Sequence, residues 1–367
     1  MEFKTVSFVG LGLIGSSIAR ALRKSGTDLT IYAVDQNISS IEAAISDGVI
    51  DKGAVEPFCE FWDCDLLFLC IPVKTAKHYI DIAARAIKSK HTVVTDVLST
   101  KKEICEYIQG ISCFPQFIGG HPMAGTEKSG YTNGFAHMFE NAYYALTPIT
   151  TTTQATINKV IALIKQIGAI PLIMEPNQHD LVTGCISHLP HVIASGLVNL
   201  TCQRETSDGL MQLMAAGGFK DITRIASSNP SMWENIVSSN KEMVIDLLDN
   251  FSSILLDFRS SLDNNNSNEI KGYFTSAKVF RDGLSQAPKS LLPKTFELVV
   301  DVSDEPGIIG KIATLLGNNG INIKNINVSN SREFELGCLK LTLPDEYNTQ
   351  LAFKVLNESS YKVYKTE

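Results

Sequence analysis

Residues 4–15 read Lys-Thr-Val-Ser-Phe-Val-Gly-Leu-Gly-Leu-Ile-Gly, and this stretch decides the fold of the chain. The apolar run that ends at Gly10 predicts a buried strand, and apolar residues at helical spacing over 13–24 predict a helix. Between the two elements, Gly10, Gly12 and Gly15 form a GxGxxG pattern. A pattern of this kind between a strand and a helix predicts a βαβ unit that binds a dinucleotide.

Each glycine of this turn has a physical use. Gly10 permits the tight turn, Gly12 lets a pyrophosphate approach the backbone, and Gly15 allows the helix to pack on the strand. Free N–H groups at the start of the helix favour the phosphate charge. Asp35 ends the next strand, and its carboxylate is suited to an adenosine ribose and would repel a 2′-phosphate, so we predict NAD as the cofactor. The predicted cofactor contacts are Gly10, Gly12, Leu13, Ile14, Gly15, Asp35, Ile71 and Pro72.

Ile71 and Pro72 are included because ligands lie at the carboxyl ends of parallel strands. A proline that merely ends its strand is the alternative for this pair. A glycine turn without any ligand is the alternative for the whole pattern.

Strands alternate with helices as far as residue 173. The expected strands are 4–10, 29–35, 65–70, 92–96 and 142–147, the expected helices are 13–24, 38–47 and 75–88, and a helix–strand pair is expected at 154–173. Several strands are apolar on both faces, as strands are in a parallel sheet covered by helices on both sides. Residues 1–173 are therefore predicted to form an α/β, Rossmann-type, doubly wound parallel sheet.

Two further domains are expected after this sheet. Residues 174–286 have long helical patterns and predict an all-α domain, followed by a linker at 285–290. Residues 294–367 have the order β-α-β-β-α-β, which predicts a ferredoxin-like α+β domain, with a turn at 304–307.

Composition limits the class of protein. The chain has 367 residues, 44% of them hydrophobic and 19% charged, as in soluble globular proteins. Its net charge is −7 and it has no long run of Lys or Arg, so we do not expect a nucleic-acid surface. Eight cysteines without a CxxC pair indicate reduced thiols. We see no signal peptide and no apolar stretch long enough to span a bilayer, and we expect a cytoplasmic protein without membrane partners.

A second informative stretch is 119–130, Gly-Gly-His-Pro-Met-Ala-Gly-Thr-Glu-Lys-Ser-Gly. Its glycines and proline predict an ordered loop and neither helix nor strand. His121 in this loop is a candidate general base, because histidine takes a proton near neutral pH. A turn with a solvated histidine is the alternative. Ser99 follows the strand 92–96, where it would reach the cofactor cleft or simply cap a helix.

Three histidines lie together at 179–191, namely His179, His188 and His191. On a helix, His188 and His191 share a face. A metal site is disfavoured, because no nearby cysteine or second carboxylate completes a set of ligands. Recognition of an anion or carbonyl and simple linking of helices remain open for these histidines.

The segment 219–233 contains a further candidate site. Arg224 lies among apolar residues and needs a partner, either a substrate carboxylate or an acidic residue such as Asp221. Trp233 is expected to line an apolar ring pocket or to belong to the ordinary core.

Taken together, the segments 10–15, 96–99, 119–130, 179–191 and 219–233 resemble the prephenate dehydrogenases of tyrosine biosynthesis. The C-terminal segment, with Asp-Glu-Pro-Gly at 304–307, resembles an ACT domain, a small amino-acid-sensing module. The resemblance covers essentially the whole chain in order. One departure is Leu-Ser-Thr at 98–100, where the family commonly has Gly-Ser-Val, and it affects the expected shape of that loop.

The resemblance implies oxidative decarboxylation of prephenate to 4-hydroxyphenylpyruvate with NAD. In this likeness His121 is the catalytic base and Ser99 assists it. The implied substrate-binding residues are Arg224, His191, His188, Glu127, Lys220 and Trp233, with Glu127 and Lys220 as an ion pair at the entrance. The resemblance also implies tyrosine as an effector of the C-terminal domain, and the long apolar helices favour a homodimer.

Two other functions remain as alternatives. An arogenate dehydrogenase would differ only in the amine that replaces the side-chain ketone of its substrate. A catalytically silent amino-acid sensor that binds NAD is the alternative from another class.

Overall fold

The computed structural model describes residues 3–26, 28–89, 91–126, 128–284, 296–303, 305–329 and 337–365. They belong to two compact units, Met1–Asp257 and Phe258–Glu367, and each unit is described by itself. The linker predicted at 285–290 lies outside the described residues, as does Asp304 of the predicted turn.

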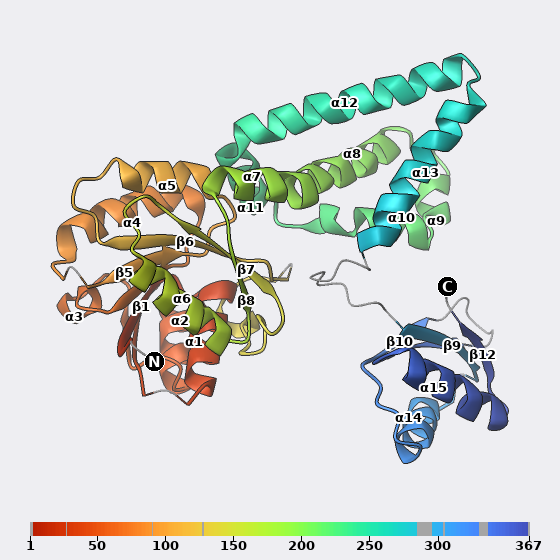
Figure 1. Ribbon diagram of the computed structural model, residues 1–367, viewed down its shortest axis with the longest axis horizontal. Helices are drawn as coiled ribbons and strands as arrows, with labels where there is room; N and C mark the ends of the chain where they lie inside the picture. The colour runs from red at the N-terminus through yellow and green to blue at the C-terminus, as the bar shows by residue number, and fades with distance from the viewer. Residues whose placement is uncertain are drawn as a thin grey trace. The chain divides into compact units, whose positions relative to one another are not determined.

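The first unit contains an eight-stranded sheet with the order β3-β2-β1-β4-β5-β6-β7-β8 (Figure 1). Its strands are β1 (Thr5–Val9), β2 (Thr30–Val34), β3 (Lys52–Ala54), β4 (Leu66–Leu69), β5 (Val93–Asp96), β6 (Gln116–Pro122), β7 (Tyr143–Pro148) and β8 (Ile170–Ile173). Its helices are α1 (Leu13–Lys24), α2 (Ile38–Ser46), α3 (Cys59–Trp62), α4 (Val73–Ala86), α5 (Lys102–Gln109) and α6 (Gln154–Gln166). The order β3-β2-β1-β4-β5-β6 is that of a Rossmann fold, which confirms the predicted fold class.

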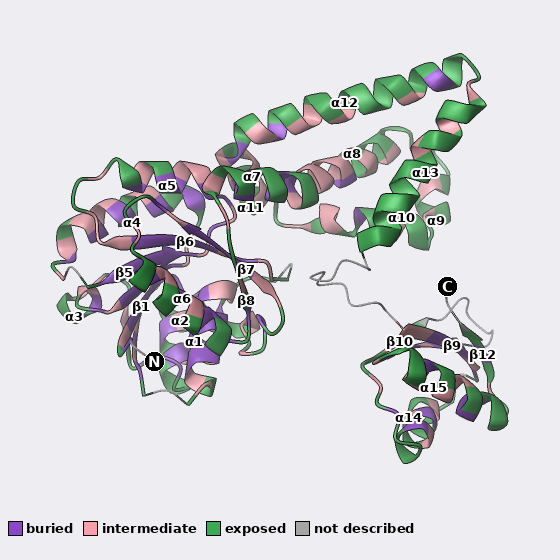
Figure 2. Cartoon of the chain, in the orientation of Figure 1, coloured by how far each residue is buried: buried purple, intermediate pink, exposed green. Residues whose placement is uncertain are grey.

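Helices cover both faces of this sheet. Phe8 on β1 and Phe68 on β4 belong to a core shared with α1, α2 and α6. Their neighbours Val9 and Leu69 belong to a second core with α3, α4 and α5. Because successive strand residues point to opposite faces, the two cores lie on opposite sides of the sheet. Figure 2 shows these strands buried between the helices.

The sheet is not parallel throughout. Strands β1 to β6 are parallel, whereas β7 pairs antiparallel with β6, and β8 pairs parallel with β7. Between β6 and β7, the described residues form a short 3-10 turn (Tyr131–Asn133) and no crossover helix. A connection of this kind lets the next strand return antiparallel beside the previous one.

The prediction of a loop over 119–130 is wrong for its first four residues. Gly119–Pro122 form the end of β6, where Gly119 pairs with Thr147 and His121 with Ala145 of β7. A Cβ atom on Gly119 would overlap the Thr147 hydroxyl, and one on Gly120 would lie 2.5 Å from the carbonyl oxygen of Asp96. These glycines therefore mark close packing within the sheet, which sequence alone does not distinguish from a turn.

A helical region completes the first unit. It contains α7 (Pro176–Thr183), the π-helical turn η2 (Gly184–His188), α8 (Leu189–Gln203), α9 (Leu210–Met214), α10 (Gly217–Thr223), the 3-10 turn η3 (Arg224–Ser227), α11 (Pro230–Ser239) and most of α12 (Lys241–Asp263). In the π turn the Leu189 N–H bonds to the carbonyl oxygen of Gly184. The next residue, Pro190, has no N–H to continue the regular ladder, so the irregular turn lies where the ladder is already interrupted.

The run Pro176–Gln203 is, by length and composition, apolar enough to cross a membrane. The expectation that no stretch of the chain passes this test is therefore wrong. The run nevertheless contains His179 and Asp180, which are 1% and 2% exposed and bond to the Rossmann strands and to α5. These contacts hold one end of the run inside a folded domain.

The second unit contains α13 (Ser267–Leu284) and a four-stranded antiparallel sheet with the order β10-β11-β9-β12. Its elements are β9 (Phe296–Val302), α14 (Ile308–Asn318), β10 (Asn325–Ser329), β11 (Gly337–Leu343), α15 (Glu346–Glu358) and β12 (Lys362–Lys365). Apolar residues of α14, of α15 and of the sheet share one core. The order β-α-β-β-α-β confirms the predicted ferredoxin-like domain.

Candidate functional site

The glycine turn has the geometry that a dinucleotide requires. Gly10 has φ +94°, and a Cβ atom there would overlap the carbonyl oxygen of Cys70. A Cβ atom on Gly15 would overlap the carbonyl oxygen of Gly10, whereas one on Gly12 would meet no atom of the described residues within 4 Å. Gly12 is also the N-cap of α1, so no side chain covers the free N–H groups. Open space at a bare helix N-terminus fits a pyrophosphate.

Asp35 lies beside the same turn. Its Oδ2 accepts a hydrogen bond from the Leu11 N–H at 2.6 Å, and its Oδ1 accepts one from the Asn37 N–H at 2.8 Å. The carboxylate is thereby held at the end of β2, where it can bind a ribose and oppose a 2′-phosphate. Ile71 contacts the turn at Gly10, and Pro72 is the exposed N-cap of α4. These residues fit NAD.

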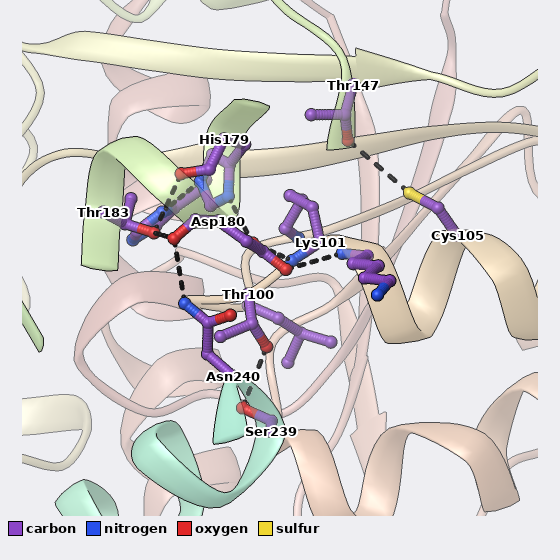
Figure 3. Close-up of polar contacts among 12 residues, drawn as sticks. Thr100, Lys101, Cys105, Thr147, His179, Asp180, Thr183, Ser239 and Asn240 are labelled. Carbon is purple, nitrogen blue, oxygen red and sulfur yellow. Dashed lines mark hydrogen bonds and ion pairs between the residues drawn. The ribbon is translucent and has the colours of Figure 1, made fainter. Parts of the chain in front are cut away.

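A chain of hydrogen bonds leads from His121 into the helical region. His121 Nδ1 lies 2.8 Å from His179 Nε2, and His179 Nδ1 lies 2.7 Å from Asp180 Oδ1. The two carboxylate oxygens of Asp180 also accept the backbone N–H groups of Lys101 at 2.7 Å and Lys102 at 2.8 Å. Figure 3 shows Asp180 between His179 and Lys101. The end of β6, the start of α5 and the helix α7 therefore meet at these residues.

This chain assigns the protons on the two imidazoles. A carboxylate only accepts, so His179 carries its proton on Nδ1. When His179 is neutral, its Nε2 accepts from the Nδ1–H of His121, and the Nε2 of His121 keeps a free lone pair. Burial, followed by the nearby His179, Lys101 and His188, holds the pKa of His121 well below 6.5. At neutral pH, His121 is therefore uncharged, which is the state that a general base requires.

His188 and His191 both lie against the Trp233 ring system. The His191 ring stacks on Trp233 with centroids 3.5 Å apart, and His188 meets the same ring edge-on at 6.1 Å. Asn240 Nδ2 donates to His188 Nδ1 at 3.1 Å and to the carbonyl oxygen of Asp180 at 2.9 Å. Burial lowers the pKa of His188 to about 4, so this histidine is neutral and supports the others from inside the fold.

Arg224 lies close to His191. It begins η3, which packs against α8, and its side chain is exposed. Burial lowers the pKa of His191, and the positive charge of Arg224 lowers it further. The two residues predicted to contact substrate are thus near each other.

The structure leaves other predicted contacts less defined. Lys220 is exposed on α10, and Ser99 is half-buried in the loop after β5. Glu127 lies outside the described residues, so the ion pair between Glu127 and Lys220 stays a prediction.

Sequence reasoning missed four residues of this network, namely Asp96, Lys101, Asp180 and Asn240. Asp180 directly follows His179, and this adjacent pair was the one signal in the sequence that could have indicated Asp180. Lys101 had no signal that separates it from Lys102, although Lys101 is fully buried and the side chain of Lys102 is 43% exposed.

Models of known families match three parts of the chain. The nucleotide-binding domain of prephenate dehydrogenase matches residues 18–172, its dimerization domain matches 175–276, and the ACT domain matches 296–337.

Individual proteins agree with these matches. The prephenate dehydrogenase of Bacillus subtilis is 36% identical over 93% of this chain and 92% of its own length. The Aquifex aeolicus prephenate dehydrogenase, solved with hydroxyphenyl propionate and NAD+, has a TM-score of 0.72 at 32% identity and covers 77% of this chain and 99% of its own. The Synechocystis arogenate dehydrogenase has a TM-score of 0.68 at 27% identity over 76% of this chain and 99% of its own. The dinucleotide turn, the family models and these likenesses together show that the chain belongs to the prephenate dehydrogenase family of NAD-dependent oxidoreductases.

Proposed function

We propose that this enzyme oxidises prephenate in preference to arogenate. The observation that carries the oxidation step is the His121–His179–Asp180 chain, in which a neutral His179 leaves a free lone pair on His121 Nε2. The preference between the two substrates rests on the charge of Arg224 beside His191. In oxidative decarboxylation the ring C4 hydroxyl becomes a carbonyl, and a base must take the hydroxyl proton. His121 Nε2 is suited to this step, because its lone pair is free to accept a proton and the imidazole ring is uncharged.

The other groups hold the substrate. When bound, NAD+ supplies the acceptor for the hydride that leaves C4. Ser99 hydrogen-bonds the C4 hydroxyl or orients His121. Arg224 holds the ring carboxylate, whose bond electrons enter the ring as carbon dioxide leaves and the ring becomes aromatic. Trp233 and His191 line the pocket around the side chain of the substrate. The main task of the protein is to align C4 of the substrate with the hydride acceptor.

Arogenate is the second candidate, and one observation favours it. His191 Nδ1 donates to the Ser187 carbonyl oxygen at 2.8 Å, so neutral His191 presents an acceptor at Nε2, which suits an ammonium group. The positive charge of Arg224 beside His191 acts in the opposite direction, because it repels that ammonium. Prephenate has a ketone at this position and no cation.

The test is to measure NADH formation from each substrate under the same conditions. We expect kcat/KM for prephenate to exceed that for arogenate by roughly tenfold or more, which corresponds to about 1.4 kcal/mol of discrimination. A preference for arogenate would reassign the substrate. If NADH forms with neither substrate, the remaining alternative is the catalytically silent amino-acid sensor.

We further propose that the C-terminal domain binds tyrosine. A cavity of about 180 Å³ lies at the start of α14 and is lined by Val302, Ser303, Glu305, Gly307, Ile308, Ile309, Val328, Gly337 and Leu339. Gly307 is the N-cap of α14 with φ +90°, so its helix presents bare N–H groups that suit an amino-acid carboxylate.

Tyrosine is expected to inhibit the full-length enzyme, and Gly307→Val is expected to raise the inhibitory concentration at least roughly tenfold. A side chain at φ +90° strains the backbone that forms the cavity. Inhibition is measured by titrating tyrosine, phenylalanine and tryptophan into the NADH assay. Gly310→Ala, in the same helix and with open space at its Cβ, is the matched control. Unchanged inhibition of the Gly307 variant would place the effector elsewhere.

We also propose a cytoplasmic homodimer, with functional domains at 1–173, 174–286 and 294–367. The family model that matches 175–276 is a dimerization domain. Apolar side chains are exposed on α8 (Leu200, 54%) and α12 (Leu256, 60%), and Figure 2 shows α12 as largely exposed and α8 as a mixture of intermediate and exposed residues. Apolar surface of this kind favours pairing with a second copy. Sedimentation should give twice the mass of one chain, and a monomer at assay concentration contradicts this proposal.

A further inference from the structure

A buried lysine, Lys101, lies against the end of strand β6 and close to the proposed base His121. The side chains of Lys101 and Asp96 have no exposed surface, and they form an ion pair. Charges in such a place are tolerated only when they are paired and hydrogen-bonded. The proposed proton transfer uses neither residue directly.

The pair holds the residue before His121. The backbone ladder between β5 and β6 ends where Thr95 pairs with Ile118. Beyond it, the Gly120 N–H donates to Asp96 Oδ1 at 2.9 Å, and the Gly120 carbonyl oxygen accepts from Lys101 Nζ at 2.8 Å. Side chains thus replace the missing ladder, and the peptide bond that joins Gly120 to His121 is fixed by the Lys101 ammonium.

Lys101 also holds the second histidine. Its backbone N–H donates at 2.7 Å to Asp180 Oδ1, the same oxygen that bonds His179 Nδ1. Lys101 therefore reaches His121 through its side chain and His179 through its main chain. In the described part of the molecule, these contacts join β6 to α7 across the start of α5.

We propose that Lys101 is a positioning residue for the reaction, which fixes the direction of His121 Nε2 by holding the Gly120 carbonyl oxygen and the carboxylate of Asp180. The inference rests on the proposed function, in which His121 is the base. Catalysis is sensitive to such placement, since a shift of about 1 Å in a reacting group can cost roughly 100-fold in rate.

The charge of Lys101 has a second effect. It lowers the pKa of His121, after burial and His179. The titratable groups around His121 in the described residues are His179 and Asp180 on α7, His188 on η2, Asp96 on β5, Lys101 before α5, and Tyr144 on β7. Removing the ammonium should therefore raise the pKa of His121 and move the acidic limb of the kcat profile to higher pH.

The test uses the full chain with Lys101→Met, which keeps the side-chain length and the backbone N–H. We expect kcat to fall roughly 100-fold with KM for prephenate and for NAD+ nearly unchanged. The acidic limb should move to higher pH. A purely structural role would reduce the folded fraction, measured by circular dichroism, and leave the pH profile of the folded enzyme unmoved.

Asp96 left unpaired is itself destabilising, so a double variant, Asp96→Asn with Lys101→Met, removes both charges together. This variant is also expected to fold and to have low kcat. Lys77→Met is the matched control, because it removes the exposed ion pair between Lys77 and Glu103 at 2.6 Å and should leave kcat and the pH profile unchanged.

The proposal is overturned if a folded Lys101→Met enzyme, or a folded double variant, has a normal kcat and an acidic limb at the same pH as in the wild type. Failure of the proposed function is recognised separately, by a wild-type enzyme that turns over neither substrate. In that case the NMR titration of His121, assigned with His121→Asn, still decides the inference. A higher pKa of His121 in Lys101→Met supports it, and an unchanged pKa overturns it.

Discussion

Replacement of His121 by asparagine is expected to lower kcat by roughly 1,000-fold, within the range for loss of a general base, with little change in KM. Asparagine retains a side-chain amide to hydrogen-bond His179, but it cannot take the proton of the C4 hydroxyl. The contact strengthens only as the proton moves, so the transition state loses more than the bound substrate does. Steady-state NADH formation with prephenate measures both constants.

The control for this variant is His137→Asn, since His137 is exposed on the surface beside Lys24 and Glu140. It should have normal activity. Near-normal turnover by His121→Asn would remove His121 from the role of base.

The pH profile of the wild-type enzyme tests the same assignment. His121 acts as a base only when it is unprotonated, so activity is lost as the pH falls through its pKa. Because burial and neighbouring groups hold that pKa well below 6.5, activity should persist below pH 6.5 and fall only at more acidic pH. An acidic midpoint of kcat at or above 6.5 would contradict the assignment of His121 as a base whose pKa is lowered.

Replacement of Arg224 by alanine is expected to raise KM for prephenate roughly 10- to 100-fold, while the affinity for NAD+ is unchanged. Hydrogen bonds to a charged group contribute about 1.5–3 kcal/mol, and the guanidinium offers two of them in parallel to one carboxylate. Arg224 lies near His191 in the helical region, whereas the predicted cofactor contacts lie in the turns after β1, β2 and β4, so the affinity for NAD+ should not change. Initial rates against each substrate, with NAD+ binding measured by fluorescence, separate these effects.

Two further variants sharpen this test. Arg224→Lys keeps the charge and loses the forked geometry, and its KM should fall between those of the wild type and the alanine variant. Arg204→Ala removes an exposed arginine at the end of α8 and should have normal kinetics. If KM for prephenate is the same in Arg224→Ala as in the wild type, Arg224 does not bind the substrate.

Local sequence patterns were sufficient for the fold and the cofactor. The alternation of apolar strands and amphipathic helices predicted the Rossmann sheet, and Gly10, Gly12, Gly15 and Asp35 predicted NAD, which the family confirms. These features are readable because glycine spacing and hydrophobic period arise from neighbouring residues. Gly119 and Gly120 were misread as turn markers, because a glycine serves a tight turn and close strand packing equally well.

By itself, the sequence determined the domain types, the dinucleotide turn and His121 as the candidate base, all of which depend on residues close together in the chain. Only the tertiary structure decided which groups surround that base. His179 meets His121 across 58 residues, and Asp180 meets the Lys101 backbone across 79. Lys101 and Lys102 are adjacent and identical, yet packing buries the first against Asp96 and exposes the second. Burial and charge pairing are properties of the folded packing, and no local pattern encodes them.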